Sequence, residues 1–233
     1  LDGHRATVSI DLSGEALHRR GRGRREGGAA PVKENVAAAL LRFVGWPARA
    51  LEGAPLVDPM CGSGTLLLEA ARIVRDEAPG LGRRRLGAEG WLGHDPALAM
   101  RLTREAEARR ASSRGRPLPL VGPDASAEAV ERARRNLARA GLGEVPVHVG
   151  AVDDLAPPDG VVPGVVVVNP PYGARLGDEI TLGPLHGKLG DVLRHRFLGW
   201  TVGVLTGSPR LAKAIGLRPE ARLAVLHGGL DAR

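Results

Sequence analysis

Cysteine is almost absent from this sequence, which contains one, Cys61, among 233 residues. One thiol cannot form an internal disulfide and indicates a reducing compartment, so we predict a cytoplasmic protein. No stretch approaches about 18 uninterrupted apolar residues, which argues against a membrane-spanning helix. The seven histidines lack the spacing of zinc ligands, and no metal is predicted. A signal peptide is missing and the chain starts at Leu1, so we expect a processed protein or a piece of a longer one.

Lysine is scarce too, and arginine supplies nearly all of the positive charge. The formal net charge is +7 and the pI is near 10.8, which favours a polyanionic partner. Arginines crowd together near the N-terminus and are punctuated by glycines. On charge alone this segment is equally compatible with a solvated arm or with an arm that neutralises phosphates. We choose the second interpretation and predict RNA contacts from Arg19, Arg20, Arg22, Arg24 and Arg25.

Short apolar runs alternate with helical patterns along most of the chain. This alternation predicts an α/β fold, with a Rossmann-like, mostly parallel sheet covered by helices on both faces. The length allows one large core of this kind. The predicted strands occupy residues 8–12, 56–58, 118–121, 145–149, 164–168, 201–205 and 223–226. The predicted helices occupy residues 32–44, 65–77, 91–111, 126–140 and 182–197, with a short one from residue 208. Ser126 is expected to be the N-cap of the helix that ends at residue 140.

The strand predicted at residues 56–58 leads into a glycine-rich turn, Pro59–Gly64. Gly62 and Gly64 let the backbone approach a ligand closely and adopt conformations that a Cβ forbids. The turn lacks both the G-x-G-x-x-G pattern and the lysine of a phosphate loop, which argues against a bound triphosphate. Asp58 ahead of two glycines suits an amine-bearing ligand such as S-adenosylmethionine. A tight strand–helix turn without a ligand is the plainer alternative.

Asp124 closes the next predicted strand. A carboxylate at the end of a neighbouring strand can hold both hydroxyls of a ribose, although alone it is more often a helix cap. Asp95 is a rival, but no convincing strand precedes it. After the third strand, Asp153 or Asp154 could accept a hydrogen bond from an adenine amino group.

The most informative segment is Asn169-Pro170-Pro171-Tyr172, which follows a run of four valines. Neither proline offers an N–H, so the carbonyls of this turn can face a ligand. Acceptors beside an aromatic ring suit a planar group with an exocyclic NH2, on a nucleobase or on an amide. The Asn169 side-chain oxygen and the Pro170 carbonyl would hold the amine with its lone pair freed, and Tyr172 would stack on the base. A paired base would first have to leave its stack.

These segments resemble the methyltransferase domain of RlmL-type 23S rRNA guanine-N2 methyltransferases, within the wider THUMP-linked RNA methyltransferase group. The matching residues are Leu12–Gly21, Ala30–Asn35, Asp58–Thr65, Ala78–Leu81, Asn169–Gly173, Phe197–Trp200 and Gly228–Asp231. The resemblance implies a class I methyltransferase fold with seven strands, one antiparallel near the end. It implies an upstream THUMP RNA-binding domain outside this chain, with residues 1–30 as a strand and basic linker and residues 31–233 as the methyltransferase domain. We expect a monomer.

The resemblance also implies which residues hold S-adenosylmethionine and the base. The expected cofactor ligands are Lys33, Glu34, Asp58, Met60, Cys61, Gly62, Ser63, Gly64, Thr65, Asp124, Asp153 and Asn169, and the catalytic segment is Asn169, Pro170, Pro171 and Tyr172. Cys61 itself is predicted to be a packing residue and not a nucleophile.

The sequence departs from the family where an acid usually follows the third strand's glycine, because Ala151 stands there. Asp153 or Asp154 would then take over the adenine contact. The alternatives left open are a tRNA guanine-N2, an adenine-N6 or a release-factor glutamine methyltransferase, and a non-catalytic RNA-binding scaffold with weakened cofactor affinity.

Overall fold

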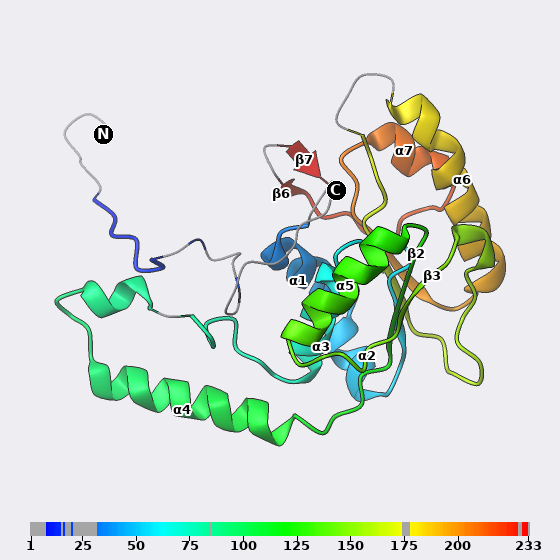
Figure 1. The fold of residues 1–233 in the computed structure, drawn as a ribbon. Helices are drawn as coiled ribbons and strands as arrows, with labels where there is room; N and C mark the ends of the chain where they lie inside the picture. The colour runs from blue at the N-terminus through cyan, green and yellow to red at the C-terminus, as the bar shows by residue number, and fades with distance from the viewer. Residues whose placement is uncertain are drawn as a thin grey trace, which may run out of the picture.

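The computed structural model describes residues 8–14, 16, 20, 32–83, 85–173, 178–227 and 230–232. At its centre lies a five-stranded parallel sheet in the order β3-β2-β1-β4-β5 (Figure 1). Its strands are β1 (Leu56–Val57), β2 (Leu120–Asp124), β3 (Val147–Val149), β4 (Val165–Val168) and β5 (Thr201–Val204). The α-helices are α1 (Glu34–Phe43), α2 (Trp46–Leu51), α3 (Thr65–Val74), α4 (Pro96–Ser112), α5 (Ala127–Arg139), α6 (Asp178–Arg196) and α7 (Pro209–Ala214).

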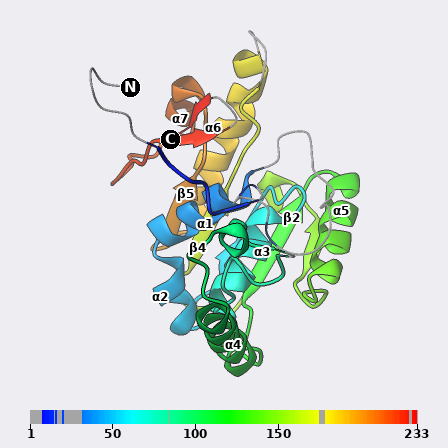
Figure 2. The same cartoon turned by 90° about the vertical axis from the view of Figure 1, so that its left-hand side faces the viewer.

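The four valines of β4 suit its place inside the sheet, where it pairs with β1 on one side and with β5 on the other. β-Branched residues suit an extended backbone, and a parallel strand covered by helices on both faces is apolar throughout. Val165 and Val167 face a core built with α1, α3 and α5. Val166 and Val168 face a second core built with α6. The predicted α/β class with helices on both faces is therefore confirmed, as a three-layer arrangement (Figures 1 and 2).

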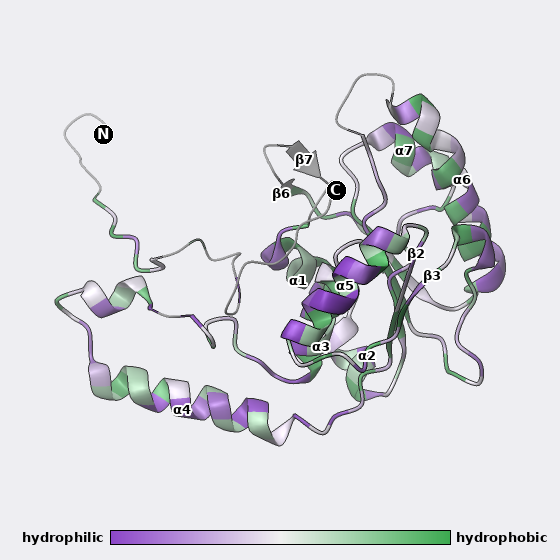
Figure 3. Ribbon diagram, viewed as in Figure 1, coloured by the Kyte–Doolittle hydropathy of each residue, from purple (hydrophilic) through white to green (hydrophobic). Residues whose placement is uncertain are grey.

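Hydropathy follows these layers closely (Figure 3). Helix α5 buries Val130, Ala133 and Leu137 at helical spacing and turns its charged side chains to solvent. Ser126 caps this helix by accepting a hydrogen bond from the Ala129 N–H at 3.2 Å, as the sequence predicted. Among the residues that the structure covers, no helix combines the length and the apolar character needed to cross a bilayer.

Three sequence predictions about the elements were wrong or incomplete. Residues 8–12 form no strand: this segment lies along the surface with Val8 exposed, and no ladder partner pairs with it among the described residues. Within the part of the chain that the structure describes, the main sheet has five strands, because β6 (Val225–His227) pairs with β7 (Leu230–Ala232) in a separate antiparallel hairpin. The short helix α2 was missed. It follows Gly45 in the left-handed region and begins with Trp46-Pro47.

Helix α4 lies beside the body and not against the sheet (Figures 1 and 2). Within α4, only Ala106 is buried. Just before it, the 3-10 helix η1 (Gly87–Gly90) contacts the N-terminal segment, where the Ala88 N–H donates to the Leu12 carbonyl at 2.9 Å. A Cβ on Gly87 would lie 2.5 Å from the Gly14 nitrogen, so glycine is required for this close approach.

Candidate functional site

The predicted site residues lie where the strand order of the sheet reverses, between β1 and β4. Strand β1 pairs with β2 on one side and with β4 on the other, so the chain winds outward in opposite senses from the β1–β4 pair. In open α/β sheets, ligands bind outside the carboxyl ends of the strands at this switch point. Asp58 follows β1 directly, Asn169 follows β4 directly, and Asp124 ends β2. The three predicted segments therefore meet at one edge of the sheet.

The glycine turn has the backbone geometry that its sequence predicted. Gly62 and Gly64 have φ angles of 55° and 81°, in the left-handed region that favours glycine. The Gly64 N–H donates to the Cys61 carbonyl at 2.7 Å, and α3 begins at the next residue, Thr65. The Cys61 N–H donates to the Pro123 carbonyl at 3.2 Å, which ties the turn to β2. A Cβ on Gly62 would lie 3.9 Å from the Met60 carbonyl oxygen, an ordinary van der Waals contact, so the positive φ and not crowding favours glycine here.

Asp58 is buried at the start of this turn, and its Oδ1 atom is enclosed without a hydrogen-bond partner among the described residues. Burial raises the pKa of Asp58 to about 8, and the nearby Asp124 carboxyl adds to the rise, whereas the Met60 N–H lowers it. A buried acid with an unused acceptor is a fitting partner for a cationic amine.

Asp124 organises the turn from the neighbouring strand. Its Oδ2 accepts the Gly62 N–H at 2.8 Å, and its Oδ1 accepts the Ser126 N–H at 2.9 Å. The carboxyl therefore both fixes the glycine turn and starts the loop into α5. Asp124 lies at the end of β2, beside Gly62, and its role as a ribose ligand stays a prediction.

The other residues of the turn that were predicted to bind the cofactor are partly buried and held by contacts with α5 and with each other. The hydroxyls of Ser63 and Thr65 lie 3.3 Å apart, and Asn136 of α5 donates to the Ser63 carbonyl at 3.0 Å. Met60 packs against the core beneath α6. The turn is thus supported by α3, α5 and β2 together.

Cys61 behaves as the predicted packing residue. It is buried, and its thiol donates to the Gly122 carbonyl at 3.4 Å. Burial and the charges of Asp58 and Asp124 raise the pKa of the thiol far above its usual value, so the nucleophilic thiolate is disfavoured.

The Asn169–Tyr172 segment leaves β4 as an irregular turn. Pro170 is buried, Pro171 is exposed, and Asn169 is half-buried with its side-chain oxygen enclosed. The Tyr172 ring is half-buried, and this burial raises the pKa of its hydroxyl. A Cβ on Gly207 would lie 3.4 Å from two ring carbons of Tyr172, so the ring packs against the loop after β5.

Asp153 lies in the 3-10 helix η2 (Val152–Asp154), where the adenine contact was predicted. Its Oδ2 accepts from Lys188 Nζ at 2.7 Å, so the carboxylate is paired with α6. Arg196, at the end of α6, donates to the carbonyls of Asp153 and Leu155 at 2.6 and 3.0 Å. Two α6 side chains therefore anchor this loop.

Lys33 and Glu34 stand at the start of α1. Lys33 precedes the helix in an extended conformation, and its carbonyl accepts the first helical N–H groups, from Val36 and Ala37. Helix α1 packs on α3, the helix that follows the glycine turn. The two predicted cofactor residues are thereby brought to the α3 side of the sheet.

Of the predicted RNA-binding arginines, the structure describes Arg20 alone; Arg19, Arg22, Arg24 and Arg25 lie outside the described residues. The Arg20 guanidinium forms a short ion pair with Glu69, which is fully buried on α3. Glu69 also accepts from Arg72 at 2.8 Å. The Arg20 side chain is thus tied to α3 instead of extending into solvent.

Several positioning residues were not found from the sequence. Lys188 and Arg196 support the loop after β3 from more than thirty residues away, and Ser208 bonds to Glu179 between the starts of α7 and α6. Their residue types are ordinary for helix surfaces and caps. No local pattern marks such long-range partners.

A family model described as UPF0020, RMKL-like, methyltransferase domain, matches residues 21–232. The chain belongs to this family. The match confirms the resemblance seen in the sequence. A Pseudomonas paraeruginosa protein named ribosomal RNA large subunit methyltransferase K/L is 47% identical over 233 residues, which is 99% of this chain and 32% of that protein. The chain therefore spans about a third of the length of the curated relatives it matches.

Solved structures agree with the fold. SMU.472, crystallised with SAH (S-adenosylhomocysteine), is 31% identical with a TM-score of 0.80, over 95% of this chain and 55% of that one. A Listeria monocytogenes protein described as a predicted N6-adenine-specific DNA methylase is 35% identical with a TM-score of 0.76, over 94% of this chain and 55% of its own. The class I methyltransferase fold is confirmed by these neighbours.

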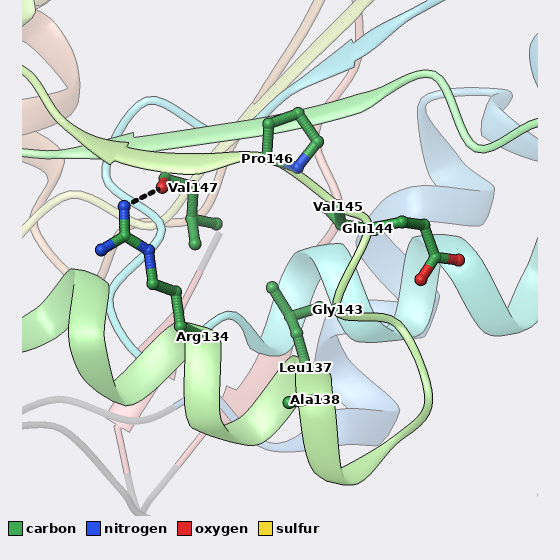
Figure 4. Close-up of a pocket in the computed structure, with 8 residues that line it drawn as sticks. All are labelled: Arg134, Leu137, Ala138, Gly143, Glu144, Val145, Pro146 and Val147. Atoms are coloured by element: carbon green, nitrogen blue, oxygen red, sulfur yellow. Dashed lines mark hydrogen bonds between the residues drawn. The ribbon is translucent and has the colours of Figure 1, made fainter.

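A shallow groove of about 320 Å³ lies elsewhere, between the end of α5 and the start of β3 (Figure 4). Arg134 crosses it to donate to the Val147 carbonyl at 2.9 Å. The groove opens at the amino end of β3, away from the carboxyl ends where the site residues gather, and we assign it no role. Within the described ranges, no group of three or more acidic, histidine or cysteine side chains is arranged to hold a metal ion.

Proposed function

We propose that this chain is the catalytic part of an RNA methyltransferase that transfers a methyl group from S-adenosylmethionine to N2 of a guanine, in large-subunit rRNA. The observation that carries the proposal is the meeting of Asp58, Asp124 and Asn169 at the switch point of the sheet. The name of the 47% identical relative supports the rRNA substrate. A cytoplasmic location and a monomeric state stay predictions.

The residues present fit the cofactor. Asp58 offers a buried, unused acceptor for the α-ammonium group, and Asp124 lies beside the glycine turn, where it can hold the ribose. Lys33, Glu34 and Asp153 are proposed to complete the site. The SAH in the SMU.472 structure supports this assignment. When bound, S-adenosylmethionine supplies an electrophilic methyl group on a sulfonium sulfur.

The protein's part in the reaction is to present the amine. The Asn169 side-chain oxygen and the Pro170 carbonyl accept the two N2 hydrogens, which favours a pyramidal nitrogen with its lone pair available. Tyr172 holds the ring of the base by stacking, a contact worth about 1–3 kcal/mol. No strong base is needed before attack, because the nitrogen becomes acidic as it is alkylated and then loses its proton. Positioning therefore supplies most of the acceleration.

Guanine is proposed over adenine on family grounds. Asn-Pro-Pro-Tyr suits any exocyclic amine, and the Listeria relative of similar fold carries an adenine name. The greater identity to proteins named for large-subunit rRNA favours the guanine assignment of the RlmL resemblance. The net charge of +7 favours nucleic acid over a protein glutamine.

The test combines the longer parent protein with unmodified large-subunit rRNA transcript, followed by nucleoside analysis. We expect N2-methylguanosine. Formation of N6-methyladenosine without N2-methylguanosine would contradict the proposal.

A second candidate is a non-catalytic RNA-binding scaffold. It is favoured by Ala151 at the usual acidic position and by the pairing of Asp153 with Lys188. Calorimetry with SAH separates the two candidates. We expect measurable binding, whereas a complete lack of binding would favour the scaffold.

A further inference from the structure

A buried hydroxyl links the loop after β5 to the start of α6. Ser208 is buried, and its Oγ accepts the Leu211 N–H at 3.2 Å as the cap of α7. The same oxygen forms a short hydrogen bond with Oε1 of Glu179. A hydroxyl carries one proton, and this proton is directed at the glutamate. Glu179 is therefore held as an acceptor in a fixed orientation, and in the sequence it follows the Asn169–Tyr172 segment closely.

The same loop also supports Tyr172. Gly207 directly precedes Ser208, and the Tyr172 ring packs against the backbone of Gly207, where a Cβ would lie 3.4 Å from the ring. Thr206 stiffens the loop, because its Oγ1 accepts the Ser208 N–H at 3.1 Å. One short, buried loop thus contacts the proposed stacking residue and, at the adjacent position, fixes a carboxyl group.

Guanine and adenine differ in the hydrogen-bonding groups that a carboxylate such as that of Glu179 could meet. A flipped-out base is read through hydrogen bonds to its Watson–Crick edge. On guanine this edge presents N1–H next to the N2 amine, and both are donors. On adenine the N1 atom is an acceptor. A carboxylate beside the amine-binding turn attracts the N1–H of guanine and repels the N1 lone pair of adenine.

We propose that Glu179 accepts the N1–H of the target guanine and so determines the choice of guanine over adenine. This inference rests on the proposed function and supplies what Asn169-Pro170-Pro171-Tyr172 lacks. Ser208 fixes Oε1, and in this proposal Oε2 accepts the N1–H of the base. Glu179 is thereby a specificity residue, and Ser208 positions it.

The variant Glu179→Gln distinguishes two roles for Glu179: recognition of the guanine N1–H, and a purely structural link between α6 and α7. The Gln variant retains an oxygen that can accept the Ser208 hydroxyl, so a structural role predicts little change. Recognition predicts a loss, because the amide lacks the charge and cannot offer two acceptors. Hydrogen bonds to charged groups correspond to about a tenfold to hundredfold effect.

The experiment uses the longer parent protein and measures N2-methylguanosine formation on unmodified large-subunit rRNA transcript at saturating S-adenosylmethionine. For Glu179→Gln we expect a rate about tenfold to a hundredfold lower, with SAH affinity within about twofold of the wild type. Ser208→Ala keeps the charge and removes the link, and we expect a smaller loss. In a short RNA with 2-aminopurine at the mapped guanine, which retains the amine but lacks N1–H, the preference for guanine should shrink in the Gln variant.

The outcomes are distinct. If the wild type forms no N2-methylguanosine, the proposed function fails and the inference fails with it. If the wild type forms it and Glu179→Gln forms it equally fast, or keeps the same preference for guanine over 2-aminopurine, Glu179 does not read the base and the proposed function stands. A parallel loss of SAH affinity would also overturn the inference, because it would show a general disruption of the site.

Discussion

Lys188 Nζ lies 2.7 Å from Asp153 Oδ2. This ion pair joins α6 to the loop in which the sequence predicted the adenine contact. Because both side chains are about half exposed, the pair by itself contributes little stability, on the order of 0–1 kcal/mol. The ion pair instead helps to position the loop: together with the hydrogen bonds of Arg196, it holds residues 151–155 at the end of β3.

Arg196 should therefore affect cofactor binding without contacting the cofactor. Replacing it with alanine removes the donor to two loop carbonyls, at 2.6 and 3.0 Å. We expect Arg196→Ala to weaken S-adenosylmethionine binding about tenfold, the effect of a lost charged hydrogen bond, with kcat at saturating cofactor nearly unchanged. Calorimetry and steady-state kinetics measure the two quantities. The control is Arg194→Ala on the same helix, which bonds to Asp191 and Gly216 instead; equal affinities for both variants would refute the prediction.

Asp124→Asn should nearly abolish cofactor binding. Each carboxyl oxygen of Asp124 accepts a backbone N–H, from Gly62 or from Ser126, and an amide would turn an NH2 group toward one of them. We expect an affinity for SAH lower by a factor of about a hundred or more, since a ribose contact and the turn are both lost. The matched variant is Asp95→Asn, which alters the cap of α4. That variant should bind SAH normally, and wild-type affinity for Asp124→Asn would remove Asp124 from the site.

Asp58 should make the ligand-free protein less stable as the pH rises. The folded pKa of about 8 lies above the ordinary value of 3.8, so between these values the folded state retains a proton that the unfolded state has lost. The free energy of unfolding therefore falls through this window. Asp58→Asn cannot titrate, and we expect it to stabilise the protein relative to the wild type by about 3 kcal/mol more at pH 8 than at pH 5.

Urea denaturation at the two pH values measures this difference. The same variant should bind S-adenosylmethionine poorly, because it lacks the charge that would meet the ammonium group. A stability difference that does not depend on pH would show that Asp58 keeps an ordinary pKa in the folded protein.

Glu69 should contribute far more stability than an exposed acid. Its side chain is fully buried and bonds to both Arg20 and Arg72, so Glu69→Gln removes a negative charge from beside two largely buried guanidinium groups, of which Arg72 keeps its contact with Glu77 at 3.5 Å. We expect a loss of about 3 kcal/mol in the free energy of unfolding, together with faster trypsin cleavage after Arg20. Glu144→Gln breaks the ion pair with Arg75 at a side chain that is 56% exposed, and should cost under about 1 kcal/mol. Equal losses for the two variants would contradict the assignment.

Local patterns in the sequence predicted most of the elements and the centre of the site. Three of these patterns depend only on residues that are close in the sequence: the valines of β4, the glycines after β1 and the helix cap at Ser126. The structure confirms all three. The prediction of a strand at residues 8–12 was wrong because a strand also needs a distant partner. Alternating apolar residues make a strand only where a partner strand is present, and the pattern contains no information about the partner.

The positions of Asp58, Asp124 and Asn169 near one another were predictable once the sheet was assumed parallel, because each follows a strand. The supporting contacts were not. Glu69 is a charged residue within a helix, yet its side chain is fully buried and paired with Arg20, 49 residues away in the sequence. Asp153 reads as a free ligand, yet Lys188 reaches it from α6.

Local sequence patterns were sufficient to predict the α/β class, the glycine turn after β1 and the irregular Asn169–Tyr172 turn after β4, because these depend on backbone conformations and burial patterns that neighbouring residues impose. Only the tertiary structure decided the strand order, the anchoring of Arg20 at Glu69 and the placement of Glu179 beside the Tyr172 loop. These contacts join residues separated by 29 positions for Glu179 and Ser208 and by 49 for Arg20 and Glu69. Their partners are chosen by how the layers pack, and packing is a property of the whole chain.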